Sequence, residues 1–514
     1  MRKLVLVALL MAVAATAWAA SDILVLGTID RATNFSFANS YDHFTWHILR
    51  HTTKALVGLE PGTNEVVPSI AESWEVSEDG LVYTFHIRPG IVFWDGHPCN
   101  AYAVEWALER TIRLNGPEGG VFLIADPIKE IDALDSLTVR ITLNYPDATF
   151  LIRMTDNVIP SLIYSPKSTP EDRFADERSY AGTGPYRIVE YVPDARVVLE
   201  AVPTYFGPEP KTKRIVWVIY ANEAALRAAV EAGDVDIAFR TFNPADIVDL
   251  QQKGTLQVVR GPSASIRYML FNVTQPPVDT ALVRQAIAYA VDRDAICSRV
   301  FSNLNTPIYT MVPAGLPPAG ASIPVFPERD LAQARALLTQ AGYSTANPLQ
   351  VNLWYTPTHY GTTEADVAAV LKQSIEEVGL IQVTIQTLEW AAYVKQMSSG
   401  GFDMFLLGWY PDYLEASNFL APWTTESPES LGTYFNRHPR YPLYREKMEE
   451  ALSAVDEAER VALYQEIQRL SAEDVPWIPL WANNQQAYMI AQKNVKGIVL
   501  DLTMEPHLEL LYKE

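Results

Sequence analysis

One carboxylate lies among aromatic side chains in the segment Gly-Trp-Tyr-Pro-Asp-Tyr at residues 408–413. The carboxylate is Asp412, and an acid that is partly desolvated by rings needs a nearby cation to stay ionised. A ligand ammonium would supply that cation, and the ring faces of Trp409 and Tyr410 would add cation–π attraction. The segment therefore indicates a site for a positively charged group. The same residues also fit a plainer reading, in which the rings are core and Asp412 caps a turn.

The neighbouring residues predict how this segment is held. Trp390 begins an amphipathic helix, and the run from Phe402 to Leu407 is short, apolar and followed by Gly408. These features predict a helix and then a buried strand that ends at the glycine. Ligands of α/β sheets commonly bind beyond the carboxyl ends of strands. We therefore expect the site where this strand opens into a loop.

Strands and helices alternate along the rest of the chain without an internal repeat. Apolar periodicity predicts, among others, helices at Asp42–Val57 and Glu223–Ala232 and strands at Leu349–Tyr355 and Lys496–Leu500. Many strand–helix alternations in two blocks predict an α/β fold with two lobes and a cleft between them.

Composition narrows the class of protein. A chain of 514 residues is too long for one hydrophobic core and should form two or more domains. The formal net charge of −21 makes nucleic acid and anionic membrane surfaces poor partners. Cys99 and Cys297 are far apart and fit no metal or redox spacing. Free buried thiols are favoured over a disulfide, and the sequence leaves this question open.

The N-terminus has the pattern of a secretory signal peptide. Arg2 and Lys3 precede an apolar run from Leu4 to Ala15, and Ala17-Trp18-Ala19 gives the small-x-small cleavage pattern. We expect residues 1–20 to be removed. Neither cysteine lies near the cut, so no lipid anchor is expected. The mature chain has no second apolar run of about 18 residues. These features predict a soluble exported protein, located in the periplasm of a bacterium with an outer membrane.

Six segments together resemble the solute-binding proteins of family 5, the dipeptide- and oligopeptide-binding group that serves ABC importers. The resemblance covers essentially the whole mature chain and is carried by the order and spacing of the segments. The segments are VVPSIAESWEVSEDGLVYTFHIRPGIVFWDGHPCNAYAVEWAL at 66–108, GTGPYRIVEYVPDARVVLE at 182–200, AGDVDI at 232–237, FNVTQPPVDTALVRQAIAYAVDRDAI at 271–296, ARALLTQAGY at 334–343 and GWYPD at 408–412.

The resemblance implies a type II, cluster C periplasmic-binding-protein fold, with two lobes and an extra domain on lobe I. It also implies a monomeric receptor without catalytic residues, cofactor or metal, which closes around a peptide and delivers it to ABC permease membrane subunits. The expected boundaries are 21–47, 177–262 and 483–514 for the lobe I core, 48–176 for the extra domain and 263–482 for lobe II.

The resemblance also implies roles for single residues. In peptide-binding members the acid of the GWxxD motif, here Asp412, pairs with the ligand's α-ammonium. Trp409 and Trp390 correspond to residues that line side-chain pockets, and Tyr410 offers backbone groups in strand-type recognition. The arginines that receive the ligand carboxylate in tripeptide binders fall on Met397 and Leu406, so that clamp is missing.

The remaining candidates concern the cleft and its closure. His359 is a candidate for the far end of the ligand, and Asn272 for a cleft position at the lobe boundary. We expect the loops Thr33–Ser36 and Gly182–Gly184 to reach the ligand from lobe I. The lobe crossovers are expected near Arg260–Ser263 and Leu480–Asn483. The loop Glu415–Phe419 lacks a proline that is common in the family, and its absence predicts a less rigid loop.

Three alternatives stay open at this stage. Trp platforms stack on sugar rings, so an oligosaccharide receptor of the same family is the main rival. A nickel-complex receptor is less favoured: His43, His47 and His51 share a helix face that we expect to be polar, with no acid or cysteine nearby in sequence. An enzyme has no nucleophile elbow, zinc-protease motif or phosphate loop in its favour. Arg284 and Arg293 are expected to form surface and interlobe salt bridges.

Overall fold

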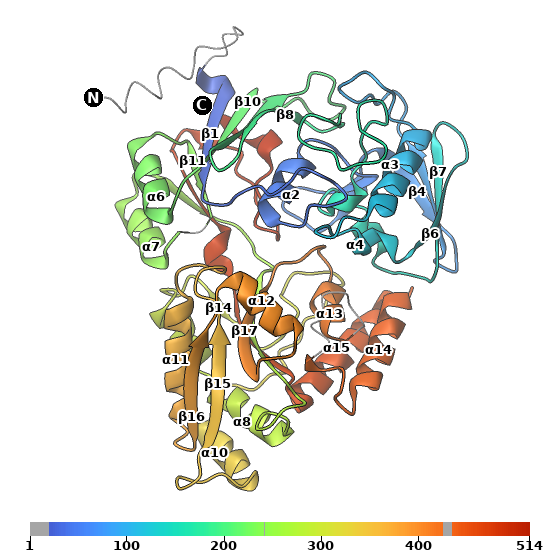
Figure 1. Cartoon of the computed structure of the whole chain (residues 1–514). Helices are drawn as coiled ribbons and strands as arrows, with labels where there is room; N and C mark the ends of the chain where they lie inside the picture. Colours follow the sequence, from blue (N-terminus) through green and yellow to red (C-terminus); the bar gives the residue numbers. More distant parts are fainter. Residues whose placement is uncertain (1–19, 241, 425–433) are drawn as a thin grey trace.

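The structure is a computed structural model that describes residues 20–240, 242–424 and 434–514. The expected signal peptide, 1–20, lies outside the described residues except for its last position. The chain forms two lobes, and Figure 1 shows lobe I above, with β1 and the C-terminus, and lobe II below it. Within the described ranges, no helix has both the length and the apolar character that a membrane crossing requires.

Lobe I is built on a mixed sheet with the order β12-β19-β11-β1-β10-β9-β8. Its central strand, β1 (Ile23–Thr28), runs parallel to both β10 (Arg214–Ile219) and β11 (Ile237–Phe239). Helix α6 (Glu223–Ala232) links these two strands across β1. The other strands are β8 (Tyr186–Val192), β9 (Arg196–Ala201), β12 (Gln257–Arg260) and β19 (Tyr488–Ala491).

A second, antiparallel sheet lies beside this core, at the right of Figure 1. Its order is β4-β5-β7-β6, alternate residues of β5 and β7 are buried, and helix α3 packs against β6 and β7. Its elements are β4 (Ala71–Val76), β5 (Val82–Ile87), α3 (Ala101–Leu114), β6 (Ile128–Ala133) and β7 (Thr138–Leu143). Helix α2 (His43–Arg50) packs against Trp217 of β10 and Phe239 of β11 in the lobe I core. The smaller elements of the extra domain are β2 (Val57–Leu59), β3 (Val66–Pro68), α4 (Phe122–Ala125) and α5 (Phe150–Arg153).

Lobe II contains a mixed sheet with the order β14-β18-β13-β17-β15-β16. Its strand β13 (Ile266–Phe271) is buried along its whole length. The other strands are β14 (Thr306–Pro307), β15 (Leu349–Tyr355), β16 (Ile381–Thr387), β17 (Met404–Trp409) and β18 (Trp477–Ala482). The helices are α8 (Ala281–Ala290), α9 (Arg293–Arg299), α10 (Leu331–Gln340), α11 (Glu364–Glu376), α12 (Trp390–Ser398), α13 (Ala421–Thr424), α14 (Tyr441–Ser453) and α15 (Glu457–Asp474).

Two chain segments cross between the lobes. One joins β12 to β13, and the other joins β18 to β19. The first crossover begins where the sequence predicted it, after Arg260. In the second, residues 480–482 still belong to β18, so the connection begins at Asn483. The strands of each sheet fall within the ranges expected for the lobe I core, the extra domain and lobe II, and we propose those boundaries for the domains.

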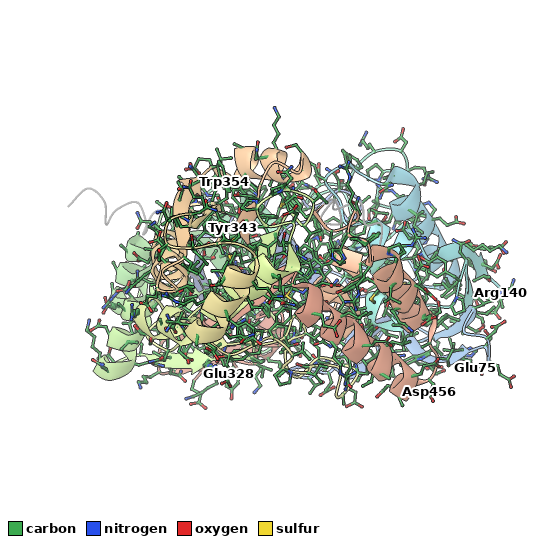
Figure 2. All side chains as sticks on the ribbon, turned by 90° about the horizontal axis from the view of Figure 1, so that it is seen from below. Glu75, Arg140, Glu328, Tyr343, Trp354 and Asp456 are labelled. Atoms are coloured by element: carbon green, nitrogen blue, oxygen red, sulfur yellow. The ribbon has the colours of Figure 1, made fainter. Side chains whose placement is uncertain are left out.

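The extra domain also contacts lobe II. The backbone N–H of Ala148 donates to the carbonyl of Leu452 at 2.8 Å, and Asn64 donates to the carbonyl of Gly315 at 2.6 Å. Figure 2, seen from below, shows Asp456 at the start of α15 on the same side of the molecule as Glu75 in the antiparallel sheet. The lobes are therefore in contact on the side of the extra domain.

Two arginines differ from the expectation. Arg284 and Arg293 are buried and donate to backbone carbonyls, including those of Asp474 and Pro479, instead of forming salt bridges at the surface or between lobes. A buried guanidinium has five N–H donors that need hydrogen-bond acceptors, and the backbone carbonyls around each arginine supply them. Cys99 and Cys297 are buried free thiols.

Candidate ligand-binding site

The strand before the site is longer at its end than the sequence predicted. β17 spans Met404–Trp409, because Trp409 pairs with Ile266 and Gly408 with Arg267 on β13. The strand therefore continues through the glycine, and the chain leaves the sheet only at Tyr410. Asp412 follows two residues later, beyond the carboxyl end of this buried strand.

Asp412 lies where the two lobes meet. The hydroxyl of Tyr41, from lobe I, donates to Oδ1 of Asp412 at 2.6 Å, and Nδ2 of Asn418 donates to Oδ2 at 3.3 Å. Desolvation raises the pKa of Asp412 to about 6, although the bonds from Tyr41 and Asn418 and the charge of Arg153 lower it in part. The carboxylate thus has neutral hydrogen-bond donors and would gain from a cation placed against it.

Asn418 orients both the carboxylate and the neighbouring indole. Its Oδ1 accepts from Trp409 Nε1 at 2.9 Å and from the backbone N–H of Asp412 at 3.0 Å. Sequence reasoning did not assign it a role. The available signal was its position in the loop directly after Asp412, since such amides often hydrogen-bond a nearby backbone.

The loop that contains Asn418 is held without the missing proline. The carboxylate of Glu415 accepts from the backbone N–H of Ser417 and caps the short 3₁₀ helix Ala416–Phe419. The hydroxyl of Tyr464 donates to the same carboxylate at 3.1 Å. A buried carboxylate therefore supports the loop in place of the proline, and lower rigidity of the loop stays a prediction.

Trp390 and His359 form one aromatic stack. Their ring centroids are 3.5 Å apart with an interplanar angle of 3°, and Tyr360 contacts both rings edge-on. Desolvation, together with the positive charge of Arg267, lowers the pKa of His359 to about 4. The imidazole is therefore neutral at pH 7 and offers no positive charge to a ligand carboxylate.

A buried arginine lies behind Gly408. Arg267 donates to Glu364, its guanidinium carbon lies 3.7 Å from the ring centroid of Tyr360, and both charged side chains are only 2% exposed. A Cβ at position 408 would lie 2.8 Å from Arg267 Nη1 and 2.8 Å from the Tyr360 ring. Gly408 is therefore required by packing. Sequence reasoning missed Arg267, although a charge inside the apolar run IRYMLF was a signal.

A small opening of about 20 Å³ lies beside this segment and is lined by both lobes. Phe242, Asn243 and Pro244 line it from lobe I, and residues 360–363 line it from lobe II. Gln486, from the second crossover, also lines it and accepts a hydrogen bond from the hydroxyl of Tyr410. Tyr360 and the second crossover therefore line one opening between the lobes, and Tyr410 is bonded to its wall through Gln486.

Two expected contributors, Asn272 and the segment Gly182–Gly184, lie away from Asp412. Asn272 follows the opposite end of β13 from Ile266, the partner of Trp409, and its Nδ2 donates to the carbonyl of Gly400 at 3.0 Å. The segment Gly182–Gly184 is buried inside lobe I, where a Cβ at either glycine would clash with the backbone at Thr52. In Thr33–Ser36, the side chains of Thr33 and Asn34 are used within lobe I. Tyr41, also from lobe I, contacts Asp412 across the lobe boundary, and a contact between Thr33–Ser36 and the ligand stays a prediction.

The three histidines of α2 are not on a polar face. His47 and His51 are fully buried, and His43 bonds the carbonyl of Thr503 at 3.0 Å. Their ring nitrogens approach Glu505 and Glu509, acids of the C-terminal segment that are distant in sequence. In the part of the chain that is described, no group of three or more His, Cys, Asp or Glu side chains is arranged to hold a metal ion. Burial lowers the pKa of His51 to about 4, although its interaction with the carboxylate of Glu509 raises the pKa in part.

Comparison with known proteins identifies the family. Residues 65–430 match the model of the bacterial extracellular solute-binding proteins, family 5, and this chain belongs to that family. It is 28% identical over 478 residues to the dipeptide-binding protein of Escherichia coli K12, covering 88% of this chain and 87% of the relative. It is 30% identical to di/tripeptide-binding protein 2 of Pseudomonas aeruginosa, covering 86% of each chain.

A solved structure agrees on the fold. The NikA protein of Brucella suis, crystallised with Fe(III)-EDTA, superposes with a TM-score of 0.86 at 21% identity, covering 96% of this chain and 100% of that one. The two-lobe fold of the periplasmic binding proteins is therefore confirmed, as the resemblance implied.

Proposed function

We propose that this chain is the periplasmic receptor of an ABC importer, which binds short peptides between its lobes and delivers them to the permease subunits. The proposal depends on one observation: Asp412 is a desolvated carboxylate between the lobes whose donors, Tyr41 and Asn418, are neutral. The names of the relatives, dipeptide- and di/tripeptide-binding proteins, support a peptide as the ligand. The receptor performs no chemistry on it.

The ammonium of the peptide would pair with Asp412. A charge-assisted hydrogen bond to a carboxylate is roughly twice as strong as a neutral one, and the desolvated position strengthens it further. The indole of Trp409, fixed by Asn418, would border the first side chain of the ligand. The stacked pair Trp390 and His359 would border a later one.

The carboxylate end of the ligand would be bound without the arginines that receive it in tripeptide-binding members of the family. Met397 and Leu406 occupy the positions of those arginines in this chain. His359 is neutral at pH 7, and Arg267 is already bonded to Glu364. Peptides would therefore be selected mainly by their amino terminus and their backbone. An oligosaccharide would give Asp412 hydrogen bonds only, so it uses less of the site.

Thermal unfolding of the purified protein tests the proposal. We expect free-amine dipeptides to tetrapeptides to raise the unfolding temperature. A ligand at 100 times its dissociation constant stabilises by about 2.7 kcal/mol. Cello- and xylo-oligosaccharides and nickel salts serve as the comparison set. A shift with sugars and none with peptides would contradict the proposal, and mass spectrometry of ligand that co-purifies checks the same point.

A further inference from the structure

One arginine of the extra domain is anchored at the boundary with lobe II. Arg153 is the last residue of α5, and its Nη1 lies 3.6 Å from Oδ2 of Asp147 and donates to the carbonyl of Leu123 at 3.4 Å. Asp147 is itself fixed, because its Oδ1 accepts from the backbone N–H and the hydroxyl of Thr149. All these partners belong to the extra domain, so they hold the guanidinium whether or not the lobes touch.

The same guanidinium covers a tyrosine of lobe II. Its carbon lies 4.8 Å from the ring centroid of Tyr413, and Nη2 donates to the hydroxyl of Tyr413 at 3.5 Å. Tyr413 is 4% exposed and the side chain of Arg153 is 12% exposed, so the contact is almost dry. Cation–π attraction is strongest between desolvated partners. Desolvation lowers the pKa of Arg153, but Asp147, Tyr413 and Glu415 raise it by more, so the guanidinium stays charged.

Tyr413 belongs to the loop of the candidate site. It follows Asp412, and its hydroxyl shares a hydrogen bond of 3.1 Å with the hydroxyl of Ser417. The backbone N–H of Ser417 donates to the carboxylate of Glu415, which is buried in the same loop. An arginine of lobe I therefore packs against a loop of lobe II that its own internal bonds already hold in place.

Further contacts extend this interface away from the candidate site. Figure 1 shows the extra domain above the helices α13, α14 and α15 of lobe II. The hydrogen bond from Ala148 to Leu452 is formed by the residue next to Asp147. A Cβ at Gly80 would lie 3.6 Å from the side chain of Val455, which follows α14. The extra domain thus meets lobe II over a surface that needs no ligand to bridge it.

We propose that Arg153 and Tyr413 form a ligand-independent latch that holds the extra domain against lobe II and increases the closed population of the empty receptor. The pairing of Arg153 with Asp147 exists in the open and the closed form and so does not oppose opening. Opening removes the ring face of Tyr413 from the guanidinium. A contact that is present only in the closed form shifts the equilibrium toward that form by its own free energy. The latch gives the extra domain a role in closure, which goes beyond the proposed function.

Single-molecule energy transfer between two dyes in the ligand-free protein tests the inference. One dye is attached at Lys129→Cys on β6 and the other at Glu446→Cys on α14, both at exposed positions on the two sides of the boundary. The natural thiols, Cys99 and Cys297, are buried. The measured quantity is the ratio of closed to open molecules.

We expect Arg153→Met and Tyr413→Leu each to lower this ratio about tenfold, which is the effect of losing one desolvated cation–π contact. The double variant should lie no lower than either single one, because both remove the same contact. Tyr413→Phe keeps the ring face and should keep most of the closed population. Arg140→Met is the matched control, since Arg140 pairs with Asp132 inside the extra domain at 2.8 Å, and it should leave the ratio unchanged.

An unchanged ratio in Tyr413→Leu would overturn the inference, and so would losses that simply add in the double variant. A wild-type receptor without a closed population in the absence of ligand would overturn it as well. Tyr413→Leu leaves the Arg153–Asp147 pair intact, so it decides the question if Arg153→Met fails to fold. Because no peptide enters the experiment, its failure is distinguishable from a failure of the proposed function, which the thermal-unfolding comparison of peptides and sugars detects.

Discussion

Asn418 contacts Asp412 through both of its amide atoms: its oxygen accepts from the backbone N–H of Asp412 at 3.0 Å, and its nitrogen donates to the carboxylate at 3.3 Å. The same oxygen accepts from the indole N–H of Trp409. One buried amide therefore fixes a charge and an aromatic wall together. This arrangement is the kind of preorganisation that a receptor for small charged ligands requires.

Replacing Asn418 with Ala should weaken binding of free-amine peptides about tenfold. The indole and the carboxylate would lose the amide that orients them, and unpaired buried donors would also cost about 1–3 kcal/mol of stability. Calorimetric titration measures the affinity, and denaturant unfolding measures the stability. Asn494→Ala, at an exposed position, is the matched control. If Asn418→Ala binds these peptides as tightly as wild type, the orientation of Asp412 and Trp409 does not depend on Asn418 and the prediction is contradicted.

Peptide affinity should fall in acid because Asp412 must be ionised to pair with an ammonium. Its pKa in the unliganded protein is raised to about 6, above the ordinary 3.8, so the carboxyl takes up a proton as the pH falls through 6. The expected loss is about tenfold at pH 5 relative to pH 7. Dissociation constants measured from pH 4.5 to 8 test this, and Asp412→Asn should give a flat profile. A wild-type curve without a break near pH 6 would contradict the assignment.

The Arg267–Glu364 pair should be essential to the stability of lobe II although it touches no ligand. Removing one partner of a buried ion pair costs about 3–5 kcal/mol, because the other charge stays buried. We therefore expect Arg267→Met to destabilise strongly and the double variant with Glu364→Gln to recover much of the loss. Arg329→Met, which disrupts a partly exposed pair with Glu377, should cost under about 1 kcal/mol. A double variant no more stable than the single one would count against the pair as the cause.

His507 should stabilise the docked C-terminal segment in its charged form. Desolvation lowers its pKa, but bonds to Asp501 and Glu509 outweigh it, and the pKa is raised to about 9 from 6.5. The folded value lies above the unfolded one, so the stabilisation is complete below pH 6.5 and is lost as the pH rises through 9. The gap in unfolding free energy between wild type and His507→Gln should shrink by about 3 kcal/mol over that range.

Denaturant unfolding at several pH values measures this gap. His97→Gln, at a half-buried position of the extra domain and without a salt bridge among the described residues, is the matched control and should show no such change. A gap that is independent of pH would mean that His507 contributes by packing alone.

The sequence predicted correctly those helix and strand boundaries that neighbouring residues determine, for example through helix capping. Helix α6 begins and ends at the predicted residues because Asn222 caps its start and Gly233, in a left-handed conformation, its end. β15 also has its predicted bounds. Other boundaries depend on tertiary contacts. β17 continues past Gly408 because β13 pairs with it, the helix predicted at 42–57 ends at Arg50, and the strand predicted at 496–500 is reduced to β20 (Val495–Lys496).

The residues of the candidate site also fall into two groups, those that adjoin one another in the sequence and those that only the fold brings together. Its contiguous part, Gly408 to Asp412, was found because the residues adjoin one another in the sequence. Tyr41 lies 371 residues from Asp412, and their contact exists only because the lobes meet, so no pattern within one segment could predict it. Arg267 and Asn272 lie at opposite ends of the same strand, and only the pairing register decides which of them lies beside Gly408.

The most direct test of the amine site is the effect of N-acetylation on the dissociation constant of one peptide ligand, measured by calorimetry for wild type and Asp412→Asn. Acetylation removes the ligand's positive charge and also adds an acetyl group, and the variant shows how much of the loss comes from that added bulk. We predict a loss of at least about 100-fold for wild type and a loss within about threefold for the variant. An equal loss in both proteins would contradict the pairing of Asp412 with the ligand ammonium.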